Sequence, residues 1–276
     1  MLYGMTNPHG GDIYGGDVHL DFSANTNPFG TPPGVMDAVS RALPDMHRYP
    51  DPYCRRLVEK IAAFEGVNRD DILCGNGAAE LIYAYCGAVR PKTALEPAPT
   101  FSEYALGLAQ VGCRVKPYYL TPDRDFVLDS HFPDYLTEIL PEAVFLCNPN
   151  NPTGALYPRE LLEQIVEIAR EKQLILLSDE IYDRLVMDGI PSYSLAALAP
   201  DLPCVTFNGL SKSHIICGFR CGWMVFSGPK GELAEVKDGV MQQFDQPQVL
   251  YDDPANQFVA DFLGNPPINN IPGTVR

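Results

Sequence analysis

Short apolar runs alternate with amphipathic helical segments along this chain from about residue 35 onward, and this alternation restricts its fold more than any other feature. Leu57, Ile61 and Phe64 repeat at the spacing of one helix face, as do the apolar residues of 161–169. Several apolar runs are continuous, which is typical of strands that are covered on both faces. The pattern predicts an α/β fold of three layers, α/β/α, with a mainly parallel sheet.

Seven runs have the length and composition of strands, so we expect a seven-stranded sheet. They are Ile72–Cys74, Thr93–Leu95, Arg114–Leu120, Ala143–Cys147, Leu174–Leu177, Cys204–Phe207 and Gly222–Phe226. Sheets of this class bind ligands at the carboxyl ends of their strands. The polar motifs of the chain follow these runs, so we expect the functional site at that edge of the sheet.

The first polar motif, Gly75–Glu80, follows the first predicted strand and begins a helical segment. Glycines followed by small residues at a helix N-terminus expose backbone N–H groups that can hold an anion. For this motif alone, a tight strand-to-helix turn is the simpler alternative. The motif is neither Gly-x-Gly-x-x-Gly nor a P-loop, which argues against dinucleotide and nucleoside triphosphate sites.

Two further loops supply an aromatic ring and an amide. Pro97–Phe101 follows the second predicted strand, and Phe101 belongs either to the core or to a place where it stacks on a planar cofactor. Asn148–Gly154 follows the fourth strand, and Asn151 precedes a proline, which favours extended backbone with the amide free to donate. A plain turn is the alternative, although the loop is longer than a turn needs.

Charged residues follow the next two strands. Asp179 comes after a buried strand, and its burial without a cationic partner would be costly, so we expect a protonated partner such as a pyridinium nitrogen. Lys212 leaves the sixth strand, where an amine that reacts with an aldehyde cofactor can be held still and partly desolvated. Ser211 and Arg220 could hold a phosphate. Alone, Lys212 has a simpler interpretation as a solvated surface lysine.

Composition excludes several classes of protein. With 46% hydrophobic and 20% charged residues, the 276-residue chain has the composition of a folded globular protein. A formal net charge of −15 argues against nucleic acid and against an anionic membrane as partners. We expect no membrane-spanning segment and no signal peptide. The eight cysteines lack metal-site spacing, so we expect no metal and reduced thiols in a cytoplasmic protein.

In this order, the motifs resemble those of the fold-type I pyridoxal 5′-phosphate (PLP) enzymes, specifically the class I/II aminotransferases, over residues 9–229. The resemblance implies PLP as cofactor, a small-molecule amino acid as substrate, and transamination through a Schiff base on Lys212. The fold that it implies is the large domain of the PLP-dependent transferases.

The same resemblance gives individual residues their roles. Asp179 would pair with the pyridine nitrogen, Phe101 would stack on the ring, and Tyr182 and Asn151 would hydrogen-bond its phenolate oxygen. The phosphate would be held by Gly77, Ala78, Ala79, Ser211 and Arg220. Tyr49 would reach the phosphate of a neighbouring subunit, which implies a homodimer with shared sites.

The resemblance divides the chain into an N-terminal arm (1–30), a PLP-binding large domain (31–230) and an atypical tail (231–276). His9, Tyr14 and Asn25 of the arm could line the substrate side, although a mobile, solvated arm is the alternative for residues 1–20.

Subfamily features differ along the chain. Residues 9–13 and 21–30 resemble threonine-phosphate decarboxylases and, more loosely, histidinol-phosphate aminotransferases, whereas 179–229 resemble alanine-type aminotransferases. Residues 235–270 resemble instead a segment of sugar-importer ABC ATPases, but the chain has no Walker A motif, so ATPase activity does not follow.

We also expect the small C-terminal domain of the family, which carries the arginine for the substrate α-carboxylate, to be missing. Its absence predicts poor turnover. Three functions remain open: an aminotransferase, an L-threonine-O-3-phosphate decarboxylase of cobalamin biosynthesis, and an inactive PLP-binding fragment.

Overall fold

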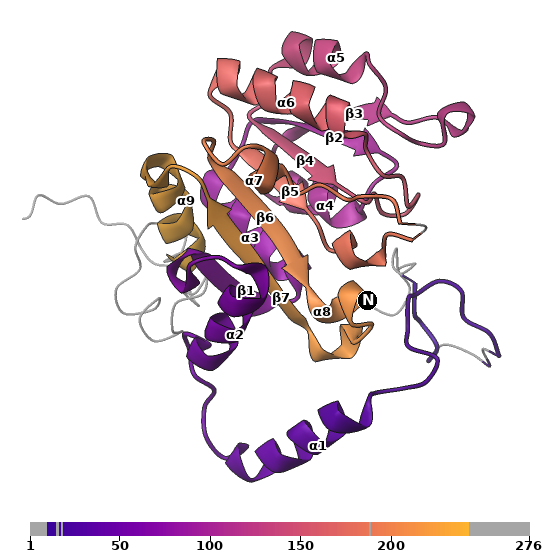
Figure 1. Ribbon diagram of the computed structural model, residues 1–276, viewed down its shortest axis with the longest axis vertical. Coiled ribbons are helices and arrows are strands. Elements are labelled where there is room, and N and C mark those ends of the chain that lie inside the picture. Colours follow the sequence, from indigo (N-terminus) through magenta and orange to yellow (C-terminus); the bar gives the residue numbers. More distant parts are fainter. Residues whose placement is uncertain (1–9, 15–16, 18, 188, 243–276) are drawn as a thin grey trace, which may run out of the picture.

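The computed structural model describes residues 10–14, 17, 19–187 and 189–242. Its strands form one seven-stranded sheet of order β1-β7-β6-β5-β4-β2-β3 (Figure 1). Neighbouring strands are parallel, except that β7 is antiparallel to both β1 and β6. The strands are β1 (Ile72–Asn76), β2 (Thr93–Ala98), β3 (Arg114–Tyr119), β4 (Ala143–Cys147), β5 (Leu176–Asp179), β6 (Cys204–Gly209) and β7 (Cys221–Ser227). The predicted mainly parallel sheet is confirmed.

All seven predicted strands are present, and their bounds differ where pairing includes polar residues. β5 begins at Leu176 rather than Leu174, because its pairing with β6 starts there, and it continues through Asp179. Similarly, β1 extends to Asn76 through its pairing with β7. Polar motifs that we expected after the strands therefore begin inside them, where the sheet holds their backbone.

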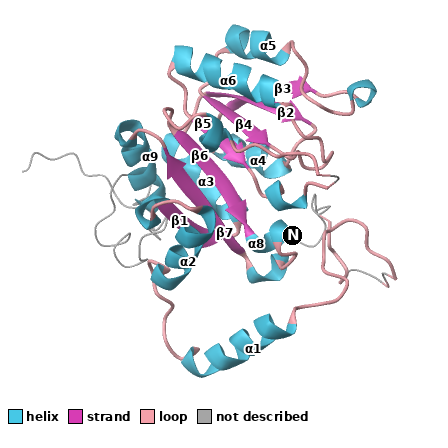
Figure 2. Ribbon diagram, viewed as in Figure 1, coloured by secondary structure: helices cyan, strands magenta, loops and turns pink. Residues whose placement is uncertain are grey.

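Helices cover both faces of the sheet (Figure 2). A first core lies beneath α3 (Ala78–Val89), α4 (Ser102–Gln110) and α9 (Lys230–Gln242), and it includes Leu81, Tyr104 and Val240. A second core lies beneath α5 (Phe132–Ile139), α6 (Arg159–Lys172) and α7 (Leu195–Leu198), and it includes Phe132, Leu162 and Leu195. The two cores give the predicted three layers.

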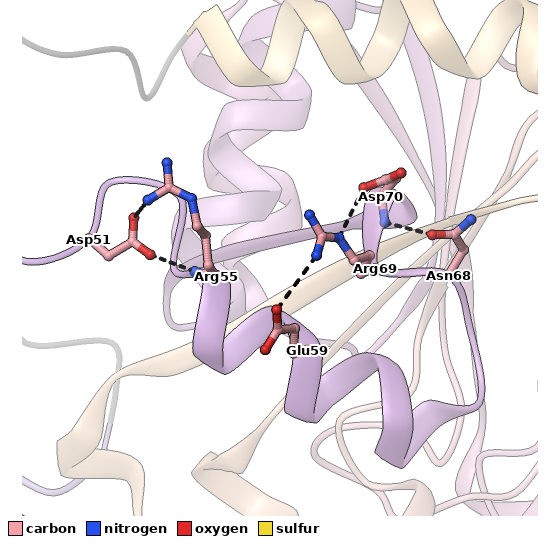
Figure 3. Close-up of polar contacts among 6 residues, drawn as sticks. All are labelled: Asp51, Arg55, Glu59, Asn68, Arg69 and Asp70. Atoms are coloured by element: carbon pink, nitrogen blue, oxygen red, sulfur yellow. Dashed lines mark hydrogen bonds and ion pairs between the residues drawn. The ribbon is translucent and has the colours of Figure 1, made fainter.

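The helix α2 (Arg55–Glu65) packs through Ile61 on Ile72 and Trp223, at the β1–β7 end of the sheet. Polar contacts hold it at its start and at its middle (Figure 3). At its start, Asp51 accepts the Arg55 N–H at 2.9 Å and the Arg55 guanidinium at 2.7 Å. Glu59 pairs with Arg69 at 3.5 Å, so α2 is tied to the segment that leads into β1.

Residues 19–53, which we call the arm segment, contain α1 (Pro33–Ala42). Figure 1 shows α1 apart from the sheet, and none of its residues is buried. The remaining helical turns are α8 (Leu210–Ser213) and the 3-10 helices η2 (Leu43–Asp45), η3 (Arg69–Asp71), η4 (Pro122–Arg124), η5 (Asp183–Leu185) and η6 (Cys217–Phe219).

The residues that follow 230 begin as the helix α9, whose Leu233 and Val240 are buried in the first core. The proposed domain boundaries stay predictions, and the tail beyond 242 lies outside the described residues. Within the described part of the chain, no helix is both long and apolar enough to span a membrane.

Candidate functional site

The sheet topology brings distant segments together at the carboxyl ends of its parallel strands. Because β7 is antiparallel, it starts at that edge, where Cys221 pairs with Asn76 of β1 and Gly222 pairs with Gly209 of β6. This edge therefore brings together three segments: the turn into α3, the α8 turn after β6, and Arg220, which precedes β7.

Close packing at this edge places Arg220 against the start of α3. Gly77 has φ 87°, and a Cβ there would lie 2.3 Å from Arg220 Nη2; a Cβ on Gly222 would lie 2.3 Å from the Ala78 nitrogen. Only glycine allows these approaches. The guanidinium donates to the carbonyls of Asn76 at 3.4 Å and Cys217 at 3.2 Å. Among the described residues it has no carboxylate partner, so its charge is available to an anion.

The N-terminus of α3 adds backbone donors beside this charge. Gly77 is the N-cap and has no side-chain cap, so the Ala78 and Ala79 N–H groups belong to the unpaired first turn of a 12-residue helix. Half-buried Ser211 lies in the α8 turn after β6, which meets the same edge. Together with Arg220, these groups fit a phosphate.

Asp179 is a buried carboxylate with neutral donors only. It is 2% exposed, and it accepts the Tyr104 hydroxyl at 2.5 Å and the Ile181 N–H at 3.1 Å. Burial raises its pKa to about 6, although both hydrogen bonds act in the opposite direction. Within the described chain it has no cationic partner, so the carboxylate fits a protonated ring nitrogen.

The amine of Lys212 lies near Tyr182. Lys212 Nζ is 5.5 Å from the centre of the Tyr182 ring and donates to Asn25 Oδ1 at 3.4 Å. Burial lowers the pKa of Lys212, which increases the fraction of neutral, nucleophilic amine. Burial raises the pKa of Tyr182 to about 12, so its hydroxyl remains a donor at neutral pH. The expected reactive lysine is thus partly desolvated.

Two side chains that sequence reasoning missed organise this edge. Asn150 donates to the Pro99 carbonyl at 3.0 Å and accepts from Thr100 Oγ1 at 3.1 Å, which joins the loops that carry Phe101 and Asn151. The unusual length of the Asn148–Gly154 loop was its only signal in the sequence.

The second missed residue is Tyr104, the residue that donates to Asp179. Its ring meets Phe101, half-buried at the N-cap of α4, edge to face, with 5.6 Å between ring centres. The three-residue spacing of the two rings at a helix start was its signal, since such residues share a helix face.

Among the described residues, Tyr49 makes no hydrogen bond or ring contact with this group. Its side chain is fully exposed in the loop before α2, which Asp51 anchors by accepting the Tyr53 N–H at 3.1 Å. Its role toward a neighbouring subunit stays a prediction. Of the arm residues, Asn25 contacts Lys212, Tyr14 is exposed, and His9 lies outside the described residues.

The described residues contain no cluster of His, Cys, Asp and Glu that could hold a metal ion. All eight cysteines are free thiols.

The chain matches a known family and several of its members. Residues 18–270 match the family of class I and II aminotransferases. The glutamate-pyruvate aminotransferase of Escherichia coli is 38% identical over 219 residues, 75% of this chain and 54% of that protein. The threonine-phosphate decarboxylase of Salmonella typhimurium is 35% identical over 213 residues, 76% of this chain and 57% of that protein.

The comparison with solved structures also finds aminotransferases. A crystal structure of an aminotransferase from Escherichia coli superposes with a TM-score of 0.70 at 35% identity, covering 79% of this chain and 56% of that one. The chain thus spans about half the length of the curated relatives it matches. The family match extends to residue 270, across the segment that resembles an ABC ATPase in sequence; that resemblance stays a prediction.

Proposed function

Because this chain belongs to the class I and II aminotransferase family, we propose that it acts as a PLP-dependent aminotransferase, moving an amino group between an amino acid and a 2-oxo acid. The observation that carries the proposal is Asp179, a buried carboxylate that has neutral donors but no cation among the described residues. A pyridinium nitrogen would supply the missing charge.

Different residues at the sheet edge would bind different parts of the cofactor. Asp179 would bind the ring nitrogen and Phe101 would stack on the ring, while Tyr182 and Asn151 would hydrogen-bond the phenolate oxygen. The phosphate would be held by Gly77, Ala78, Ala79, Ser211 and Arg220. When bound, PLP supplies an electron-accepting ring for the bond broken at the substrate α-carbon.

The side chains then have separate tasks. As a carboxylate, Asp179 would keep a proton on the ring nitrogen. Lys212 Nζ would hold the cofactor through its aldehyde and, when its amine is free, would accept the proton of the substrate α-carbon. The lowered pKa of Lys212 favours both tasks, because each needs the neutral amine.

Small amino acids and their 2-oxo acids are the substrates we propose, since the relative from Escherichia coli is named for glutamate and pyruvate. Decarboxylation of threonine phosphate is the second candidate, and the relative from Salmonella typhimurium favours it. Incubation with each substrate separates them: a 2-oxo acid product supports transamination, and carbon dioxide release supports decarboxylation.

We propose further that the chain works as a homodimer in the cytoplasm. The exposed Tyr49 would complete the phosphate site of the neighbouring subunit, and eight free thiols suit a reducing compartment.

Borohydride reduction of the PLP-treated protein, followed by peptide mapping, tests the cofactor assignment. We expect the label on Lys212 and its complete loss in Lys212→Ala. The control Lys116→Ala removes an exposed lysine of β3 and should leave the label unchanged. No label at any residue would refute the assignment, and a label without turnover of any amino acid would favour an inactive PLP-binding protein.

A further inference from the structure

Tyr104 occupies a buried position between two expected cofactor contacts. Its side chain is fully buried, its hydroxyl donates to Asp179 Oδ2 at 2.5 Å, and its ring meets Phe101 edge to face. One residue therefore contacts both the carboxylate expected at the ring nitrogen and the aromatic ring expected on the ring face.

The surroundings of Tyr104 prevent it from turning away. Its ring stacks on Phe145 with 4.8 Å between ring centres and 9° between planes. Phe145 in turn packs against Tyr85 and Phe207 at 6.1 and 6.2 Å. In a core of this density, side chains keep a single arrangement, so the hydroxyl stays directed at Asp179.

The hydrogen bond has a definite effect on the carboxylate. It occupies Oδ2, while the Ile181 N–H occupies Oδ1, and together they hold the plane of the Asp179 carboxylate. A donor to an ionised group also stabilises the anion in a buried place. Without this hydroxyl, Oδ2 would lack a partner among the described residues and the carboxylate could rotate.

We propose that Tyr104 is a positioning residue, which fixes the Asp179 carboxylate and the Phe101 ring in the arrangement that a bound pyridine ring requires. This inference rests on the proposed function and adds to it a residue that does not itself touch the cofactor.

The test combines Tyr104→Phe with a matched control, Tyr85→Phe. Tyr85 is also buried and packs on Phe145, but in the described part of the chain its hydroxyl does not bond Asp179. We expect Tyr104→Phe to weaken PLP binding about tenfold, as loss of a hydrogen bond to a charged group does. In the Asp179→Asn background the same change should cost less than about twofold, because the pair is already broken.

A spectroscopic measurement separates positioning from loss of stability. The ¹⁵N chemical shift of ring-labelled PLP bound to the protein reports the proton at the ring nitrogen directly. We expect Tyr104→Phe to move this shift and Tyr85→Phe to leave it unchanged. Replacement of Tyr104 by 3-fluorotyrosine keeps ring and hydroxyl, strengthens the donor, and should move the shift in the opposite direction, even if Tyr104→Phe fails to fold.

The outcomes are distinct. If the wild-type chain binds PLP on Lys212 and Tyr104→Phe matches Tyr85→Phe in affinity and in ¹⁵N shift, the inference is wrong and the proposed function stands. The same holds for an unchanged shift with 3-fluorotyrosine. If the wild-type chain takes no PLP label, the proposed function fails and the inference fails with it.

Discussion

The edge of the sheet and the arm segment differ in how far their side chains are buried. At the sheet edge, Asp179 and Tyr104 are buried and bonded to each other. In the arm segment, Phe29 and Tyr49 are 95% and 100% exposed, and α1 buries no residue. The part of the edge where we propose that the cofactor ring binds is therefore buried within one chain. The arm segment presents apolar side chains that, among the described residues, nothing covers.

The enclosed edge holds two adjacent carboxylates that differ in their partners. Glu180 accepts from Ser178 at 2.7 Å and from the Leu195 N–H at 3.2 Å, where it caps α7. Burial raises its pKa to about 7 and that of Asp179 to about 6. Glu180 serves the fold, whereas Asp179 lies at the strand end where the cofactor is expected. The comparison predicts different responses to pH and to PLP.

The largest effect we expect is a loss of stability as pH rises. Both carboxylates have a higher pKa in the folded than in the unfolded chain, so between about pH 4 and 7 the folded state binds more protons and the free energy of unfolding falls. For Asp179, the change from 3.8 to about 6 corresponds to about 3 kcal/mol. Urea unfolding of the apoprotein from pH 4.5 to 8 measures it.

Two variants separate the contributions of the two carboxylates to the pH dependence of the free energy of unfolding. Asp179→Asn should reduce the fall in the free energy of unfolding at the lower pH values of this range, and Glu180→Gln should reduce the fall that extends toward pH 7. PLP should offset the Asp179 contribution alone, because only that carboxylate gains a cation. An identical slope in Asp179→Asn and wild type would contradict the burial argument.

The fold followed from the sequence because burial on both faces leaves continuous apolar runs, which a single sequence displays directly. Several of the seven strands were predicted this way, and so was their mainly parallel arrangement; β3 (Arg114–Tyr119), at the edge of the sheet, mixes polar and apolar residues and buries none of them. Strand ends were less certain: Asn76 and Asp179 pair within the sheet because their neighbours hold them, and a polar residue carries no local sign of such pairing.

At the site, residue type predicted the chemistry and topology supplied the contacts. Asp179 and Lys212 stand out because a charge next to a buried strand needs a reason. Tyr104 and Asn150 do not stand out in the sequence, because buried tyrosines and loop asparagines occur in proteins for many different reasons. Their partners lie 75 and 50 residues away, at distances along the chain that local patterns do not encode.

An intermediate effect is expected at the phosphate end of the enclosed edge. Gly77→Ala would place a methyl group 2.3 Å from Arg220 Nη2 and would displace the guanidinium. We expect PLP to bind about tenfold more weakly, as for the loss of one charge-assisted contact. Equilibrium titration of PLP and of pyridoxal, which lacks the phosphate, measures the change; only PLP should lose affinity.

Gly66→Ala is the control for adding a Cβ at a positive-φ glycine without a contact to Arg220. Gly66 has φ 70°, close to the 87° of Gly77, but a Cβ there meets nothing within 4 Å. Gly66 is left-handed αL (ψ 31°), whereas Gly77 has ψ 161°, a region that alanine adopts at greater cost, so Gly77→Ala should lose more stability. Only Gly77→Ala should also lose the preference for PLP over pyridoxal. Equal preferences in the two variants would remove Arg220 from the phosphate site.

The smallest effect is expected in the arm segment, and it tests whether a second chain completes the site. Tyr49 is fully exposed, so Tyr49→Phe should leave the free energy of unfolding of one chain unchanged. If its hydroxyl binds the phosphate of a neighbouring subunit, PLP affinity should fall about threefold, within the range of one hydrogen bond. Titration at several protein concentrations, alongside sedimentation, should show the difference only where dimers form.

The control, Tyr53→Phe, changes a tyrosine of the same loop whose ring lies under the Arg55 guanidinium, and it should have no effect on PLP affinity. A Tyr49→Phe effect that persists in the monomer would place Tyr49 in the site of its own chain and remove the reason for assigning the exposed arm to a partner.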